Sequence, residues 1–139
     1  MPNRWLLKTE PSGYSYDDLE RDGRAVWDGV SNALALRHLR QFRKGDTVVI
    51  YHTGTVRAAI GTARVAADPY PDPLAGDPKL VVVDLVPVRR WAAPVQLDAI
   101  KARKDLAGWE LVRLPRLSVL PIPDAPWDAL LRMAGETRG

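Results

Sequence analysis

The sequence contains no cysteine among its 139 residues, so disulfide bonds and thiolate metal sites are excluded. Only two histidines, His38 and His52, are present, which argues against a zinc site. No apolar run approaches the roughly 20 residues needed to cross a bilayer. The first five residues also lack the apolar core of a signal peptide. We therefore expect a soluble, cytoplasmic protein with no metal, no cofactor and no membrane association.

The length predicts one domain, residues 1–139, built around a single core. The formal charge is only +3, but the charges are unevenly distributed along the chain. Residues 29–45 carry four basic side chains and no acid, whereas acids gather in 17–22 and 68–77. This asymmetry suits a polyanionic partner and equally suits an ordinary solvated surface, so both interpretations stay open.

Local patterns predict a mixed order of strands and helices. Ser15 and Asp18 resemble a capping box that opens a short helix ending near Gly23. Gly61 inside an apolar run suggests a bulge or a close backbone approach. We expect strands over 4–9, 46–52, 56–66, 80–88 and 117–120, and further helices over 33–44, 97–104 and 126–133.

Prolines in 68–73 argue against regular structure there, because proline lacks the backbone donor. Strands and helices do not alternate regularly, so a doubly wound parallel sheet is not expected. The pattern instead favours an α+β fold, a small mixed barrel with helices packed outside.

The stretch 26–32 lies between two helical segments and combines three kinds of side chain. Trp27 offers an aromatic face, Asp28 precedes the glycine of a tight turn, and Asn32 can cap the following helix. Such a set could bind a planar polar ring, as nucleic-acid sites do. The alternative is that Trp27 belongs to the core and Asn32 is only a cap.

The sequence gives only weak indications of a catalytic site. A triad could be drawn from Ser118, His52 and Asp28, but no Gly-x-Ser-x-Gly elbow surrounds any serine. Glu10 and Asp28 could form a carboxylate pair, although nothing in their spacing selects one. No glycine-rich phosphate loop is present.

Several segments together resemble the EVE domain family, in the same order and over nearly the whole chain. The segments are Trp5-Leu6-Leu7-Lys8-Thr9-Glu10-Pro11, Tyr14-Ser15-Tyr16-Asp17-Asp18-Leu19, Trp27-Asp28-Gly29-Val30-Ser31-Asn32, Gly45-Asp46, Tyr51-His52-Thr53, Tyr70-Pro71-Asp72-Pro73, Asp77-Pro78-Lys79 and Arg116-Leu117-Ser118-Val119. The resemblance implies a PUA-like fold, a bent mixed β-barrel flanked by helices and related to YTH and ASCH domains.

The resemblance also implies a non-catalytic reader of a modified base, mainly modified cytosine in DNA. Alternatives are a modified-base binder of RNA, or a small hydrolase acting on an amide or nucleoside through Lys8, Glu10 or His52, since the fold does not determine the activity. In YTH relatives a Lys-Ser segment, a tryptophan and a downstream asparagine line the base pocket. The base-binding residues expected here are Lys8, Thr9, Glu10, Trp27, Asp28, Asn32, Tyr51, His52, Leu117 and Ser118.

Two departures from the family pattern bear on this pocket. Ser31 stands where the family usually has arginine, and the loop after Pro73 is shorter than usual. A second aromatic wall of YTH relatives has no counterpart near that loop, so the cage is either more open than theirs or closed by Tyr51 or Leu117. The nucleic-acid backbone is expected along one helix face that carries Arg37, Arg40 and Lys44. We expect a monomer that prefers DNA to RNA.

Overall fold

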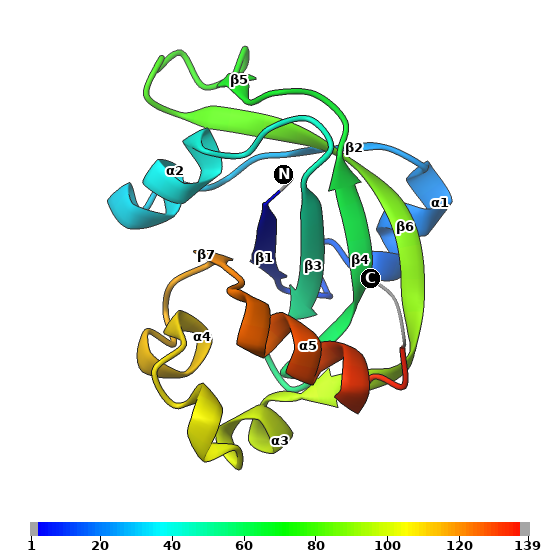
Figure 1. The fold of residues 1–139 in the computed structure, drawn as a ribbon. Coiled ribbons are helices and arrows are strands. Elements are labelled where there is room, and N and C mark those ends of the chain that lie inside the picture. Colours follow the sequence, from blue (N-terminus) through cyan, green and yellow to red (C-terminus); the bar gives the residue numbers. More distant parts are fainter. Residues whose placement is uncertain (1–2, 137–139) are drawn as a thin grey trace.

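The computed structural model describes residues 3–136 and shows one curled, half-closed barrel with helices at its ends and side (Figure 1). Seven strands form one sheet in the order β2-β6-β4-β3-β1-β7, with β5 paired to β6. The strands are β1 Arg4–Thr9, β2 Ala25–Trp27, β3 Thr47–His52, β4 Ala58–Val65, β5 Tyr70–Pro71, β6 Val81–Gln96 and β7 Val119–Pro121. The predicted α+β class, with a bent mixed sheet, is confirmed.

The helices are short and lie outside the sheet (Figure 1). They are α1 Tyr16–Asp22, α2 Ala33–Arg40, α3 Leu97–Lys101, the 3₁₀ turn Lys104–Leu106, α4 Glu110–Arg113 and α5 Asp124–Met133. The predicted capping box is present, because Ser15 and Asp18 exchange side-chain and backbone hydrogen bonds at the start of α1. Among the described residues no helix is long and apolar enough to span a bilayer.

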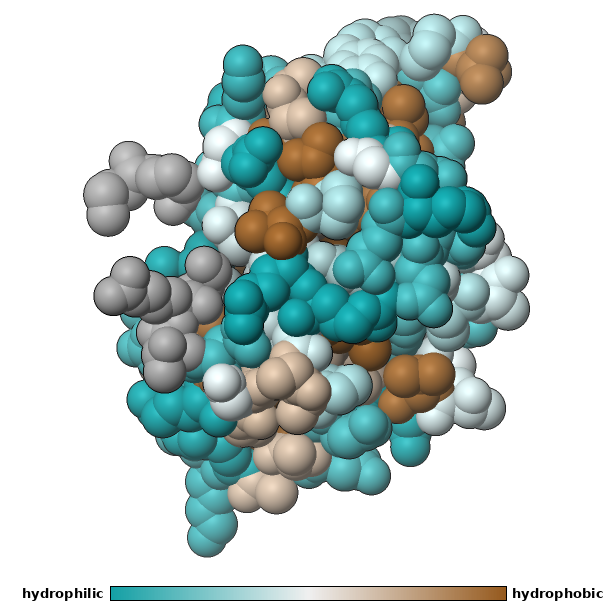
Figure 2. Space-filling view, turned by 90° about the vertical axis from the view of Figure 1, so that its right-hand side faces the viewer, coloured by the Kyte–Doolittle hydropathy of each residue, from teal (hydrophilic) through white to brown (hydrophobic). Residues whose placement is uncertain are grey.

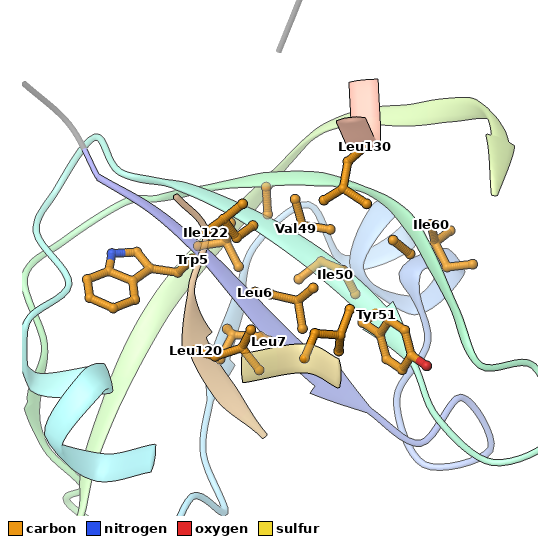
Figure 3. Packing of buried hydrophobic residues seen from close by; sticks show 14 of the residues in the cluster. Trp5, Leu6, Leu7, Val49, Ile50, Tyr51, Ile60, Leu120, Ile122 and Leu130 are labelled. Atoms are coloured by element: carbon orange, nitrogen blue, oxygen red, sulfur yellow. The ribbon is translucent and has the colours of Figure 1, made fainter. Parts of the chain in front are cut away.

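The core is built from the central strands, as Figure 3 shows. β1 pairs in parallel with β3 and antiparallel with β7, so strands from distant parts of the chain meet there. Leu6, Leu7, Ile50 and Leu120 are fully buried between these strands. Trp5 and Tyr51 lie at opposite ends of this cluster (Figure 3). The parallel pair therefore brings the carboxyl ends of β1 and β3 to one edge of the barrel.

Gly61 marks a bulge, as its position in an apolar run predicted. The pairing of β4 shifts register on both sides of this glycine. A Cβ there would lie 2.5 Å from the Arg89 carbonyl oxygen, so only glycine permits this approach. The bulge bends β4 and β6, which supports the curled shape of the sheet.

Several elements differ in extent from those expected, and three of the differences have a clear structural cause. Helix α2 ends at Arg40 instead of residue 44, because the Asp46 carboxylate accepts the backbone N–H of Arg43 and draws the chain into a turn. The segment Tyr70–Pro71 forms a two-residue strand, since Tyr70 pairs with Val82. Strand β6 runs to Gln96 and not to residue 88, because its second half pairs with β4.

Two further elements, one strand and one α-helix, were not predicted. Residues 25–27 form an edge strand, in which Val26 pairs with Asp84 and Trp27 with Val83. Residues 110–113 form the single turn α4. Both elements are too short to show a hydrophobic period, so tertiary pairing and not local pattern creates them.

Figure 2 shows the face of the molecule on the α1 side. It is mainly hydrophilic, with hydrophobic residues in small groups separated by polar ones. Arg90 of β6 forms ion pairs with Asp17 and Glu20 of α1, and its guanidinium lies 5.0 Å from the Tyr16 ring centroid. These contacts fasten α1 across the sheet, beside the carboxyl end of β1.

Candidate functional site

A cavity of about 740 Å³ opens where β1 ends, between the turn that follows it and strand β2. Its volume lies within the usual range for small-ligand sites. The lining residues are Lys8, Thr9, Glu10, Gly13, Tyr14, Asp22, Arg24, Ala25, Val26, Trp27, Asp28, Gly29, Val30 and Ser118. We call this space the Trp27 cavity. It combines one indole and one phenol with both acidic and basic groups.

Trp27 forms part of the wall and is itself nearly buried, with 8% of its surface exposed. Pairing with Val83 in β6 fixes its backbone, so the indole is carried by an edge strand and not by a loop. The Tyr14 ring meets it edge-on, with the ring centroids 5.9 Å apart and the planes at 87°. Trp5 and Trp109 donate their indole N–H groups to protein oxygens, but within residues 3–136 Trp27, like Trp91 and Trp127, makes no such bond. Its N–H is therefore not used by another described residue.

Tyr14 is the second aromatic wall of the cavity, which the sequence interpretation did not find. The Thr9 hydroxyl donates to the Tyr14 carbonyl oxygen at 2.7 Å, and the Tyr14 hydroxyl donates to Asp22 at 2.8 Å. Burial, reinforced by Asp22, raises the pKa of Tyr14 to about 12. The ring is therefore neutral at physiological pH. The signal was its place within the family segment that precedes α1.

Lys8 lines the cavity from β1, near its carboxyl end. Its ammonium group donates to the Pro115 carbonyl oxygen at 2.8 Å and lies 5.7 Å from the Tyr51 ring centroid. Burial lowers the pKa of Lys8. An ammonium group has three donors, so those not used by Pro115 can serve a ligand acceptor.

Acidic groups supply the acceptors. The Glu10 carboxylate accepts from the Ser12 hydroxyl at 3.2 Å and from the Thr53 hydroxyl at 3.3 Å, which fixes its position. Gly54 has a φ of 73°, and a Cβ there would lie 2.6 Å from a Glu10 carboxylate oxygen. Glycine is thus required beside Glu10. Asp28 lines the same cavity and is exposed.

Six of the ten expected base-binding residues line this one cavity: Lys8, Thr9, Glu10, Trp27, Asp28 and Ser118. The structure brings them together because the sheet is curled, so that β2, at one end of the strand order, lies near the end of β1 and the start of β7, at the other. The other four, Asn32, Tyr51, His52 and Leu117, do not line it.

Each of those four has another place in the structure. Asn32 caps α2 by accepting the backbone N–H of Leu34 and Ala35, and it lies with Leu117 along a different groove. Tyr51 is buried beneath Lys8. The expectation that Tyr51 or Leu117 closes the cage differs from the structure, in which Tyr14 takes that position.

His52 is a buried structural acceptor. Its Nε2 atom accepts the backbone N–H of Tyr16 at 3.0 Å, at the start of α1. Burial is the main cause that lowers the pKa of His52, so the neutral ring is favoured. The ring holds α1 against the end of β3 and does not reach the Trp27 cavity.

The three basic residues expected on one exposed face of α2 do not all lie there. Arg37 is exposed on the helix, whereas the Arg40 guanidinium donates to the Lys79 carbonyl oxygen at 2.6 Å. Lys44 lies beyond the end of α2, in the turn before β3. Arg37 is therefore the one member of the three that is exposed, helical and without a hydrogen bond among residues 3–136.

Comparison with known proteins decides the family. The model of the EVE domain matches residues 3–133, almost the whole chain. This chain belongs to the EVE domain family.

Relatives of this EVE domain occur in animals and bacteria. Mouse thymocyte nuclear protein 1 is 28% identical, over 96% of this chain and 74% of its own length. A crystal structure of a protein from Agrobacterium tumefaciens is 33% identical and has a TM-score of 0.94, covering 99% of this chain and 96% of the other.

A structure of human THYN1 in complex with DNA containing 5-methylcytosine shares the fold. Its TM-score is 0.86 at 24% identity, covering 98% of this chain and 99% of the other. The barrel is thus the PUA-like fold that the resemblance implied.

Proposed function

We propose that this EVE domain is a non-catalytic reader of a modified base, which holds a flipped modified cytosine of DNA in the Trp27 cavity. The observation that carries the proposal is the Trp27 indole, which lines the cavity, meets the Tyr14 ring and has no acceptor for its N–H within residues 3–136. The DNA complex of the human relative supports the same class of ligand.

The chemistry of the cavity suits a cytosine ring. A base that leaves its stack loses a few kcal/mol in duplex DNA, and stacking on one aromatic side chain returns about 1–3 kcal/mol. The exocyclic amine of cytosine is a donor that carboxylates accept, and Glu10 and Asp28 both line the cavity. Lys8 offers donors to the ring acceptors. Shape and hydrogen bonds are thus sufficient for binding.

A catalytic role has less support. General acid–base catalysis requires a group that can reach the substrate and exchange a proton. His52, which stands in one of the family segments, is buried, and its Nε2 atom accepts the backbone N–H of Tyr16. Incubation of 5-methylcytosine oligonucleotides with the protein, followed by mass spectrometry, tests this directly: we expect no product, and turnover would contradict the proposal.

The binding experiment compares matched single-stranded oligonucleotides with cytosine or 5-methylcytosine at one central position, as DNA and as RNA. We expect the wild type to bind the modified DNA most tightly. Trp27→Ala should weaken that binding by about 1–3 kcal/mol, since the stacking surface is lost. Fluorescence anisotropy measures the affinity.

Trp127→Ala is the matched control, because Trp127 is half-buried, contacts Arg4 and lies outside the cavity lining. It should leave the affinity unchanged. Thermal melting of both variants separates loss of binding from loss of folding. Equal binding of modified DNA by Trp27→Ala and wild type would overturn the proposal.

A further inference from the structure

A second groove of about 370 Å³ lies close to the Trp27 cavity. It is lined by the start of α2, by the last residue of α4 and by the segment between α4 and β7. The lining residues are Asn32, Leu34, Arg113, Leu114, Pro115, Arg116 and Leu117. We call this the flanking groove. None of its lining residues lines the Trp27 cavity.

The two sites share one wall. Leu117 lines the flanking groove and Ser118 lines the Trp27 cavity, and consecutive Cα atoms are only about 3.8 Å apart. Lys8 fastens this wall, because its ammonium donates to the Pro115 carbonyl oxygen and its backbone N–H donates to Ser118. A ligand that fills the cavity and continues along the chain wall would enter the groove.

The groove combines apolar and cationic surface and contains no acid. Leu34 is 36% exposed although it is a large apolar residue, and it lies there beside Leu114 and Pro115. Arg113 and Arg116 are both exposed. Within residues 3–136 the Arg116 guanidinium forms no ion pair or hydrogen bond, and Arg113 donates only to the Gly108 carbonyl oxygen, at 3.4 Å.

This combination fits one nucleotide of a strand. Guanidinium groups bind phosphate oxygens in a planar, two-pronged geometry, while a sugar and the face of a base pack on apolar side chains. An acidic peptide would match the charges too, but the shared wall places the groove one residue from a cavity suited to a base. Because the groove continues from the Trp27 cavity, a nucleotide of the same strand is the favoured occupant.

We infer that the flanking groove binds the nucleotide next to the flipped base, with its phosphate held by Arg113 and Arg116 and its sugar or base against Leu34. This inference rests on the proposed function of the Trp27 cavity. According to this inference, the DNA backbone follows the segment before β7 and not the exposed face of α2, where the sequence had predicted it. Phosphate contacts of this kind hold the strand without discriminating among bases.

The test is a length series of single-stranded DNA. The probes are 5-methyl-2′-deoxycytidine, the two dinucleotides that place thymidine before or after it, and the trinucleotide with thymidine on both sides. Each probe displaces a fluorescent 5-methylcytosine oligonucleotide from the full chain. We expect one of the two dinucleotides to bind about fivefold more tightly than the nucleoside, a modest gain because both guanidinium groups are exposed.

The variant Arg113→Ala with Arg116→Ala should lose this gain and keep the affinity for the nucleoside. Its salt dependence with the oligonucleotide should also become shallower, by about 0.7 in slope for each lost contact with a single strand. The pair Arg113→Lys with Arg116→Lys keeps the charges and should retain part of the gain. A matched control, Arg64→Ala with Arg132→Ala, removes two exposed charges from β4 and α5, outside both sites.

The outcomes distinguish the two proposals. If the Arg113 and Arg116 alanine variant keeps the full dinucleotide gain while Trp27→Ala abolishes binding, the groove inference is wrong and the cavity proposal stands. If no probe binds, or Trp27→Ala has no effect, the cavity proposal fails and the groove inference fails with it. A wild-type dimer that Leu34→Asp converts to a monomer would assign the groove to a second copy of the chain.

Discussion

Trp5 and Trp27 are both nearly inaccessible, with 4% and 8% of their surfaces exposed, yet the two indoles are held differently. Trp5 stacks on Phe42 with ring centroids 4.8 Å apart, and its N–H donates to the buried Asp46 at 3.0 Å. Trp27 meets only the edge of Tyr14 and lines a cavity, with no protein acceptor for its N–H among the described residues.

The difference separates a structural tryptophan from a candidate binding residue. Burial alone does not distinguish the two, because a ligand wall can be almost as covered as a core. What distinguishes them is that Trp27 lines a cavity, whereas Trp5 is stacked in the core with its N–H bonded to Asp46. By this criterion Trp5 stabilises the fold, and Trp27 retains a group for a partner.

The largest expected effect is on stability at Trp5. Trp5→Ala removes the stacked pair and leaves the buried Asp46 carboxylate without one of its donors. Truncation of a buried tryptophan lowers the free energy of unfolding by about 3–5 kcal/mol. Urea denaturation of Trp5→Ala and Trp27→Ala measures this. A larger loss for Trp27→Ala than for Trp5→Ala would reverse the comparison.

A smaller effect is expected from His52, whose Nε2 atom, like the Trp5 indole nitrogen, is hydrogen-bonded within the protein. Burial lowers the folded-state pKa of His52 below the ordinary value of 6.5, with Asp17, Arg90 and Glu10 acting in opposite senses around it. Its neutral form therefore stabilises the fold fully above pH 6.5. That stability is lost as the pH falls through the lowered value, where protonation breaks the bond from Tyr16.

We expect the free energy of unfolding to decrease below pH 6.5, and His52→Gln to make this decrease shallower. Glutamine can still accept from the Tyr16 N–H. His38→Gln is the control variant, since burial also lowers the pKa of His38. Denaturation at several pH values measures the slopes. An identical pH dependence in His52→Gln and wild type would show that His52 is not the acid-sensitive group.

The smallest effect is expected at Tyr14, the partner of Trp27. An edge-to-face aromatic pair contributes about 0.5–1.5 kcal/mol. Tyr14→Leu should weaken binding of 5-methylcytosine DNA by about this amount, whereas Tyr14→Phe, which loses only the bond to Asp22, should bind almost as wild type. Anisotropy titrations compare the two. Stronger loss in Tyr14→Phe would mean that the hydroxyl, and not the ring, contacts the base.

Much of the fold could be predicted because its signals are local. The run that forms β1 and the capping box of α1 are visible in the sequence, and both are confirmed. Strand β2 is three residues long and exists because Val26 pairs with Asp84. No local pattern encodes such pairing, so Trp27 was expected on a loop.

The site shows the same division. The residues of the Trp27 cavity that stand in family segments, such as Lys8 and Trp27, could be predicted from the resemblance. Tyr14, although it also stands in a family segment, and Arg24 were not expected in the cavity, and Asn32 lies outside it because its side chain caps α2. The family segments in the sequence predicted which parts of the chain form the cavity. They did not predict which side chains of each segment face it.

The most direct test follows the indole N–H signals of the ¹⁵N-labelled protein by NMR during titration with 5-methylcytosine DNA. The Trp27 signal is assigned as the one missing in Trp27→Phe. We predict that it shifts most on binding, while the Trp5 signal, bonded to Asp46, stays in place. A Trp27 signal that does not move while the DNA binds would contradict the central claim.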